Sequence, residues 1–99
     1  MKNFRCYQLA KELYQECKKL PLKGTQRDQL LRASLSVCLN LAEGSAKQTN
    51  KERRRFYFIA FGSQREVHAL LDLEGINHLT NHSDHLGASL YKLTQSISP

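Results

Sequence analysis

The chain has 99 residues, of which 40% are hydrophobic and 24% are charged, and its formal net charge is +6. This length and balance are typical of a single soluble domain, which we expect to span residues 1–99, and no apolar run approaches the roughly 20 residues of a membrane span. The N-terminus also lacks the apolar stretch of a secretory signal, so we expect a cytoplasmic protein without a membrane partner.

Apolar residues recur at intervals of three and four along the chain, which predicts an all-α protein. A first helix is expected over about residues 4–20, where Pro21 stops it. Residues 25–28 have the pattern of a capping box and predict the start of a second helix, which Gly44 is expected to end.

A second capping box at residues 49–52 predicts the start of a third helix that ends within residues 75–79. Ser83 or Asp84 is expected to cap a fourth helix. Because the connections are short, the helices are predicted to pack as an antiparallel up-down-up-down four-helix bundle. The expected core residues of the third helix are Phe56, Ile59, Ala60, Ser63, Val67, Leu70 and Leu71.

The second and third predicted helices also carry large apolar residues outside their core stripes. These residues are Leu35 and Leu39 on the second helix and Phe58 and Phe61 on the third. A monomer would leave them in water, which is unfavourable. We therefore predict that copies of the chain bury them in a ring-like homo-oligomer.

A line of polar residues follows the second helix: Arg32, Ser36, Asn40 and Glu43. These residues fall within about 80° of one another on an ideal helix, and we expect them to face Ser63 and Glu66 of the third helix. The favoured interpretation is a hydrogen-bonded seam that fixes helix register, with Arg32, Asn40 and Glu43 also reaching the oligomer interface. The alternative makes Glu43 and Glu66 metal ligands in a small nuclease, but a recognised metal-binding spacing is absent.

Other residue types give little indication of catalysis. The cysteines are Cys6, Cys17 and Cys38, an odd number without metal-knuckle spacing, and we expect them to be reduced and buried. His78, His82 and His85 are spaced by four and three, but they fall in a segment predicted to be a turn, where this spacing does not form a metal-binding face. A nucleophile elbow and a phosphate-binding loop are both missing, so we expect no enzyme activity, no metal and no cofactor.

The distribution of basic residues is the main indication of function. Residues 1–55 contain 13 of the 15 lysines and arginines and 5 of the 9 acidic residues, a net charge of +8, whereas residues 56–99 contain 2 basic and 4 acidic residues, a net charge of −2. This asymmetry favours a polyanionic partner. The predicted nucleic-acid-binding residues are Lys47, Lys51, Arg53, Arg54 and Arg55, together with Lys23 and Arg27.

The three consecutive arginines need a particular explanation. They lie in the first turn of a predicted helix, where the macrodipole disfavours cations, and phosphate binding would offset that cost. We therefore predict that replacing Arg53, Arg54 and Arg55 with glutamine weakens binding to all nucleic-acid sequences alike and leaves the fold intact. The alternative is a solvated face with Arg–Glu pairing between subunits.

Two blocks of the sequence resemble a known signature. The first runs from Arg32 to Gly44, and the second runs from Phe56 to Glu66 with Ile59-Ala60-Phe61-Gly62-Ser63 at its centre. Together with Tyr7-x-Leu9-Ala10 and Leu20-Pro21, they are similar to the bacterial four-helix-bundle family, also called the 23S rRNA intervening-sequence protein family. The accessory variability proteins of diversity-generating retroelements belong to the same family. The resemblance covers about residues 4–74.

The resemblance implies a homopentamer of four-helix protomers, a basic surface that binds RNA or DNA and, in the retroelement branch, a reverse-transcriptase partner. We therefore expect a non-enzymatic nucleic-acid-binding accessory protein linked to rRNA intervening sequences or to retroelement reverse transcription. Two alternatives stay open: a self-assembling scaffold without a nucleic-acid role, and the small metal-dependent nuclease. Salt-dependent binding separates the first alternative from the main prediction, and magnesium-dependent cleavage that is lost in Glu43→Gln would support the second.

Overall fold

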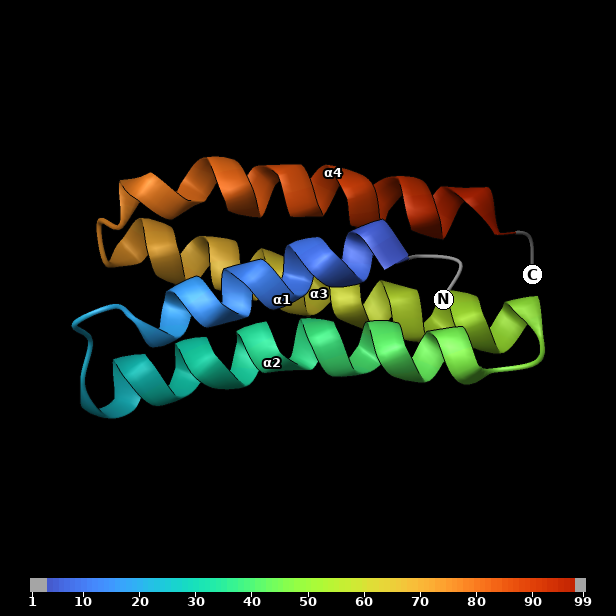
Figure 1. The fold of residues 1–99 in the computed structure, drawn as a ribbon, viewed down its shortest axis with the longest axis horizontal. Coiled ribbons are helices and arrows are strands. Elements are labelled where there is room, and N and C mark those ends of the chain that lie inside the picture. The colour runs from blue at the N-terminus through green and yellow to red at the C-terminus, as the bar shows by residue number, and fades with distance from the viewer. Residues whose placement is uncertain (1–3, 98–99) are drawn as a thin grey trace.

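The computed structural model describes residues 4–97, which form four α-helices and one short 3-10 helix (Figure 1). The helices lie along the longest dimension of a molecule that measures 40 × 22 × 18 Å. Their bounds are α1 Phe4–Lys18, α2 Gly24–Ala46, α3 Asn50–Leu73, η1 Asn77–Leu79 and α4 Thr80–Ser96. Residues 4–97 contain no strand, which confirms the all-α prediction, and none of their helices is long and apolar enough to cross a membrane.

Contacts between the helices fix their register. The Ser36 hydroxyl of α2 lies 2.8 Å from the Ser63 hydroxyl of α3, and Gly44 of α2 packs against Tyr57 of α3. Residue numbers therefore increase along α2 in the direction in which they decrease along α3. This pair of helices makes the most extensive contact in the bundle, and α1 with α4 makes the least extensive contact of the four adjacent pairs.

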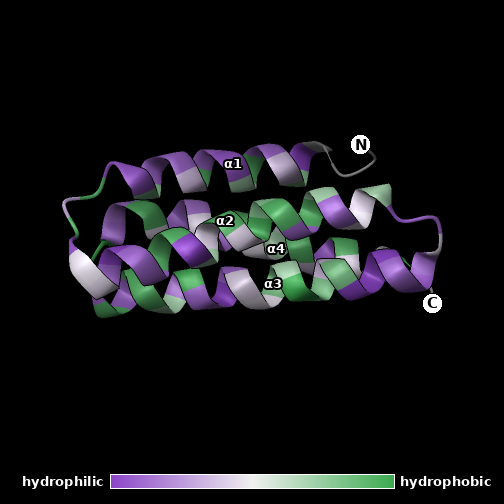
Figure 2. Ribbon diagram, turned by 90° about the horizontal axis from the view of Figure 1, so that it is seen from below, coloured by the Kyte–Doolittle hydropathy of each residue, from purple (hydrophilic) through white to green (hydrophobic). Residues whose placement is uncertain are grey.

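The core takes an apolar stripe from each helix, and leucine is its most frequent large side chain. Burial of one such side chain stabilises the fold by about 1.5–3 kcal/mol. Figure 2 shows that hydrophobic residues also occur on the visible outer surfaces of α2 and α3. The fully buried leucines are Leu13, Leu30, Leu41, Leu71, Leu86 and Leu90.

The buried face of α3 differs from the predicted one. Tyr57 and Gln64 are buried, whereas Ile59 is 41% exposed, so the prediction of Ile59 as a core residue is wrong. Gly44 has no side chain, which lets the Tyr57 ring pack closely against α2. Gln64 Nε2 donates to the Ser83 carbonyl oxygen at 2.8 Å and to the Ser83 hydroxyl at 3.0 Å. These bonds offset the cost of burying an amide, so packing and hydrogen bonding override hydropathy here.

Both ends of α2 also differ from prediction. Lys23 is the N-cap residue and makes no side-chain capping bond, so residues 25–28 do not act as a capping box. The helix continues past Gly44 to Ala46, because Gly44 is a buried packing position and not a helix end. At the start of α3, by contrast, the predicted cap is confirmed: Thr49 Oγ1 accepts a hydrogen bond from the Glu52 amide at 3.2 Å.

The turn between α3 and α4 lies earlier in the chain than predicted. α3 ends at Leu73, and Gly75 adopts a left-handed conformation with φ +69°, which suits glycine and turns the chain. α4 begins at Thr80, so neither Ser83 nor Asp84 caps it. Ser83 instead lies inside the helix with its side chain buried.

The three thiols should react slowly in the folded protein. Burial raises the pKa of Cys17 and of Cys38 to about 11 and also raises the pKa of Cys6, from an ordinary value of 9.0. All three are buried and free of disulfides. We expect slow labelling by a maleimide in native buffer at neutral pH and fast labelling in denaturant. Fast labelling of the native protein would contradict this burial.

The same pKa shifts set a pH dependence of stability. Because the folded-state pKa values are raised, the stabilisation is fully present below pH 9.0, where thiols are protonated in both states. Unfolded thiols lose their protons above pH 9.0 while the buried ones keep them up to about pH 11, so the free energy of unfolding should fall across this window.

Candidate nucleic-acid interface

The structure places the predicted basic residues at two opposite ends of the bundle. Lys47, Lys51 and residues 53–55 surround the turn between α2 and α3, whereas Lys23 and Arg27 lie at the turn between α1 and α2 (Figure 1). Lys23 and Lys47 flank the whole length of α2 and are about 36 Å apart at 1.5 Å per helical residue. The predicted residues therefore do not form one patch on a single protomer.

Arg27 has a local structural role at its end of the bundle. Its Nη1 donates to the carbonyl oxygens of Lys18 at 3.2 Å and of Leu20 at 3.4 Å, where α1 ends. This contact ties the start of α2 to the end of α1. Lys23 is exposed next to it.

Arg53 and Arg54 explain why arginines are tolerated at the start of α3. Arg53 Nε donates to the Lys47 carbonyl oxygen at 2.8 Å, and Arg53 Nη1 donates to Asn50 Oδ1 at 3.1 Å. Arg54 Nε donates to the Thr94 carbonyl oxygen of α4 at 3.2 Å. Both side chains thus reach the C-terminal ends of neighbouring helices, where cations are favoured. We therefore expect their replacement to lower the stability of the bundle, and that the fold itself stays intact remains a prediction.

Arg53→Gln is expected to lower the free energy of unfolding by about 1 kcal/mol, because it removes charge-assisted bonds from a half-buried position. Urea denaturation monitored by circular dichroism measures this change. The matched control is Arg55→Gln, which alters an exposed residue without a bond to a helix end and should stay within about 0.5 kcal/mol of the wild type. Equal losses in both variants would contradict the capping role.

Three cations of this cluster, Lys47, Arg54 and Arg55, lie beside aromatic rings. The Lys47 Nζ and the Arg55 Cζ are 5.1 Å and 5.4 Å from the centroid of the Phe56 ring. The Arg54 Cζ is 4.8 Å from the centroid of the Phe58 ring. Such cation–π contacts are worth about 0.5–1 kcal/mol at exposed sites and hold the charges in place. The run of three arginines followed by Phe-Tyr-Phe over residues 53–58 is the sequence signal for this arrangement, which a count of charges does not reveal.

The polar seam between α2 and α3 is confirmed within one chain for Arg32 and Ser36, which meet the predicted partners on α3. Arg32 forms an ion pair with Glu66. The Ser36 hydroxyl meets the Ser63 hydroxyl at 2.8 Å, and Asn40 Nδ2 donates to the Ser36 carbonyl oxygen at 2.9 Å. The Arg32–Glu66 and Ser36–Ser63 contacts fix the register of the two helices, whereas the Asn40 bond lies within α2.

The carboxylates proposed for the nuclease alternative are separated. Glu66 contacts Arg32, and Glu43 lies eleven residues further along α2, a rise of about 16 Å. The two carboxylates therefore cannot share one metal ion within a protomer. Across residues 4–97, no group of three or more histidine, cysteine, aspartate or glutamate side chains could hold a metal.

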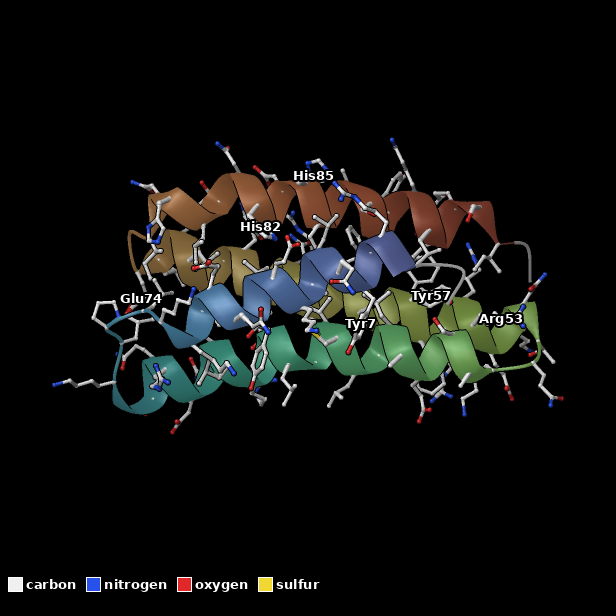
Figure 3. All side chains as sticks on the ribbon, viewed as in Figure 1. Tyr7, Arg53, Tyr57, Glu74, His82 and His85 are labelled. Atoms are coloured by element: carbon white, nitrogen blue, oxygen red, sulfur yellow. The ribbon has the colours of Figure 1, made fainter. Side chains whose placement is uncertain are left out.

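The histidines are arranged differently from prediction, since the segment predicted as a turn is helical. His82 and His85 both lie on α4, and Figure 3 shows them near α1. His82 Nε2 lies 3.0 Å from the Leu9 carbonyl oxygen and 3.9 Å from Glu12 Oε2. His82 therefore joins α4 to α1.

The outward side of the α2–α3 pair carries an apolar surface, which we call the α2–α3 outer face and define by Leu35, Leu39, Phe58 and Ile59. Their exposed fractions are 37%, 58%, 41% and 41%. The register set by the polar seam places Leu39 level with Ile59. Large apolar side chains left in water together are typical of an interaction surface.

Phe61 does not belong to this surface. It is half-buried, packs against the core, and its ring centroid lies 6.1 Å from that of Tyr91 on α4. Its position on α3 turns it toward α4, whereas the overlooked Ile59 takes its place on the α2–α3 outer face.

Comparison with known families gives one result. The family model described as 23S rRNA-intervening sequence protein matches residues 4–98. The chain belongs to this family. The match extends through α4, beyond the residues on which the sequence resemblance rested. Neither the curated proteins nor the solved structures provide a match to this chain.

Proposed function

We propose that this member of the 23S rRNA-intervening sequence protein family is a non-enzymatic, nucleic-acid-binding oligomer that acts as an accessory factor in RNA or retroelement processing. The observation that carries the proposal is the cationic cluster at the turn between α2 and α3, formed by Lys47, Lys51 and residues 53–55. Lys51 and Arg55 are exposed, and Lys47 is half-buried against Phe56. An RNA partner agrees with the family description, which names an intervening sequence of 23S rRNA.

The proposal includes self-association through the α2–α3 outer face. Antiparallel up-down-up-down bundles would bury Leu35, Leu39, Phe58 and Ile59 against neighbouring copies, with Arg32, Asn40 and Glu43 beside them. A ring of five copies is the arrangement that the family resemblance suggests. Such a ring repeats the cationic cluster around its axis, so one nucleic acid can contact several copies.

The experiment is a titration of random-sequence RNA and of duplex DNA, followed by fluorescence anisotropy at several salt concentrations. Affinity should fall with salt, with a slope of log K against log salt of about −0.7 per phosphate contact on single strands and about −0.9 on duplex DNA. The test variant changes Lys47, Lys51 and Arg55 together to glutamine, because none of these side chains bonds a helix end. Its slope should be flatter by about 2 units on single strands, and binding should weaken alike for all sequences.

The matched control changes Lys11 and Lys18 of α1 and Lys19, which follows α1, to glutamine, and so removes the same charge away from the cluster. It should keep most of the wild-type slope. Absence of wild-type binding at low salt would favour the scaffold alternative. A scaffold would also associate through the exposed α2–α3 outer face. Magnesium-dependent cleavage of the RNA during the titration would favour the nuclease alternative.

A further inference from the structure

The Cys6 Sγ and Ser89 Oγ atoms lie 3.1 Å apart across the seam between α1 and α4. His82 closes it at one point through its contacts with Leu9 and Glu12. Beyond this point lie three cavities of about 280, 230 and 450 Å³. The first two share lining residues with each other, and Leu93 and Ser96 line both the second and the third. The cavities therefore adjoin one another, and we call the three together the α1–α4 groove. The first two lie between α1 and α4, and the third is lined by residues of α2, α3 and the C-terminal end of α4.

The lining of the α1–α4 groove is basic along its length. Arg5 of α1 and Lys92 of α4 line the first two cavities, His85 lines the first, and Arg53 lines the third. Among the described residues that line the three cavities, none is aspartate or glutamate. Lys92 is notable because it is one of the 2 basic residues in the acidic half of the chain. Such a lining attracts an anionic chain.

The hydroxyl groups and the length of the groove also suit a phosphodiester backbone. Ser89 and Ser96 lie beside Arg5 and Lys92, and serine hydroxyls are common phosphate contacts in proteins that bind nucleic acids. From His85 to Ser96, α4 rises about 16 Å, the length of about five stacked nucleotides at 3.4 Å each. A duplex could contact this narrow seam only through the convex outer surface of one of its two backbones.

The third cavity has a different character. Leu93, Ile97 and Tyr57 supply an apolar wall, and Asn50 and Arg53 supply hydrogen-bond donors at its rim. Its volume of about 450 Å³ lies within the usual range for small-molecule sites. An apolar wall with a polar rim suits an unpaired base, which has an apolar face and a polar edge. Figure 3 shows Arg53 and Tyr57 at this end of the bundle.

We infer that the α1–α4 groove binds a single strand of nucleic acid, with its phosphates on Arg5 and Lys92 and one unpaired base in the third cavity. The inference rests on the proposed function and refines it, because it assigns single-stranded binding to a groove that meets the cationic cluster only at Arg53. α1 and α4 form the side of the bundle away from the α2–α3 outer face (Figures 1 and 2). The groove therefore stays open when copies associate through that face.

The test compares a short uridine oligonucleotide with a duplex DNA of equal length, each titrated against the full-length protein at several salt concentrations. The variant Arg5→Gln with Lys92→Gln should flatten the single-strand salt slope by about 1.4 and change the duplex slope much less. A second variant, Ser96→Glu, places a negative charge between the second and third cavities and should weaken single-strand binding at least tenfold. Ser96 is exposed near the end of α4 and donates only to the Leu93 carbonyl oxygen, so its replacement should be tolerated by the fold.

The control variant, Lys11→Gln with Lys19→Gln, removes the same charge from exposed positions on α1 and in the turn after it, outside the groove lining. If both groove variants bound the single strand as tightly as the control does, the inference would be overturned and the proposed function would stand. No binding of either nucleic acid by the wild type would overturn both. If the groove variants lost affinity for the single strand and for the duplex equally, the groove would also be rejected as the binding site, because such losses would reflect net charge alone.

Discussion

Gly44→Ala is expected to lower the free energy of unfolding by about 2 kcal/mol, although alanine is the better helix former. A Cβ at this position would lie 2.7 Å from Tyr57 Cε1, 3.0 Å from Tyr57 Cδ1 and 3.1 Å from Phe56 Cβ. Tyr57 is buried and Phe56 Cβ is held by the backbone of α3, so neither can move aside without shifting a helix. Overpacking of this kind costs about 1–3 kcal/mol, which exceeds the roughly 1 kcal/mol that alanine gains in helix propensity. Thermal unfolding at one fixed protein concentration measures the change, with a shift in Tm of about 4–8 °C per kcal/mol for a domain of this size.

Gly62→Ala provides the matched control. Gly62 also lies inside a helix, but a Cβ there would meet nothing within 4 Å in the protomer. Its replacement should raise stability by about 0.5–1 kcal/mol through helix propensity alone. If the Gly44→Ala variant proved as stable as the Gly62→Ala variant, that result would contradict the close packing of α2 against α3.

The double variant Leu39→Lys with Ile59→Lys is expected to abolish self-association and leave the protomer folded. Leu39 is 58% exposed and Ile59 is 41% exposed in the protomer, and a lysine at either position can extend its charged end into water, so their replacement costs the fold little. In an oligomer each would contribute about 1.5–3 kcal/mol by burial, and two lysines on adjacent helices would repel their counterparts across the interface. Sedimentation velocity should show a single species near 11.4 kDa, while the wild type sediments as a larger one.

Tyr91→Lys is the control for this variant, because Tyr91 is a 55% exposed apolar residue on α4 and lies outside the α2–α3 outer face. It should sediment like the wild type. A wild type that sediments as a monomer at micromolar concentration, or a double variant that keeps the wild-type mass, would contradict assembly through this face.

The sequence predicted the helices well because hydrophobic periodicity reports which face is buried. The leucine stripes of α1 and α2 and the Thr49 cap depend on neighbours three or four residues away, which the sequence displays directly. The polar seam followed from the same geometry. The buried face of α3 could not be predicted in this way, because the burial of Gln64 depends on Ser83, nineteen residues further along the chain.

The candidate site was predictable only in part, for a similar reason. Charge counting found the cationic cluster, but the carbonyl groups that hold Arg53 and Arg54 belong to the ends of α2 and α4. Arg54 and Thr94 are 40 residues apart, and Arg5 and Lys92 are further apart still. Only the packing of four helices brings such residues together, so local sequence patterns could not reveal the α1–α4 groove.

The most direct test of the account is sedimentation velocity of a fluorescently labelled single-stranded RNA in the presence of micromolar wild-type protein, detected through the label. At low salt the RNA should move in a complex whose mass equals the RNA plus several 11.4 kDa copies, and high salt should release it. RNA that sediments alone at low salt, or in a complex with a single copy of the chain, would contradict a nucleic-acid-binding oligomer.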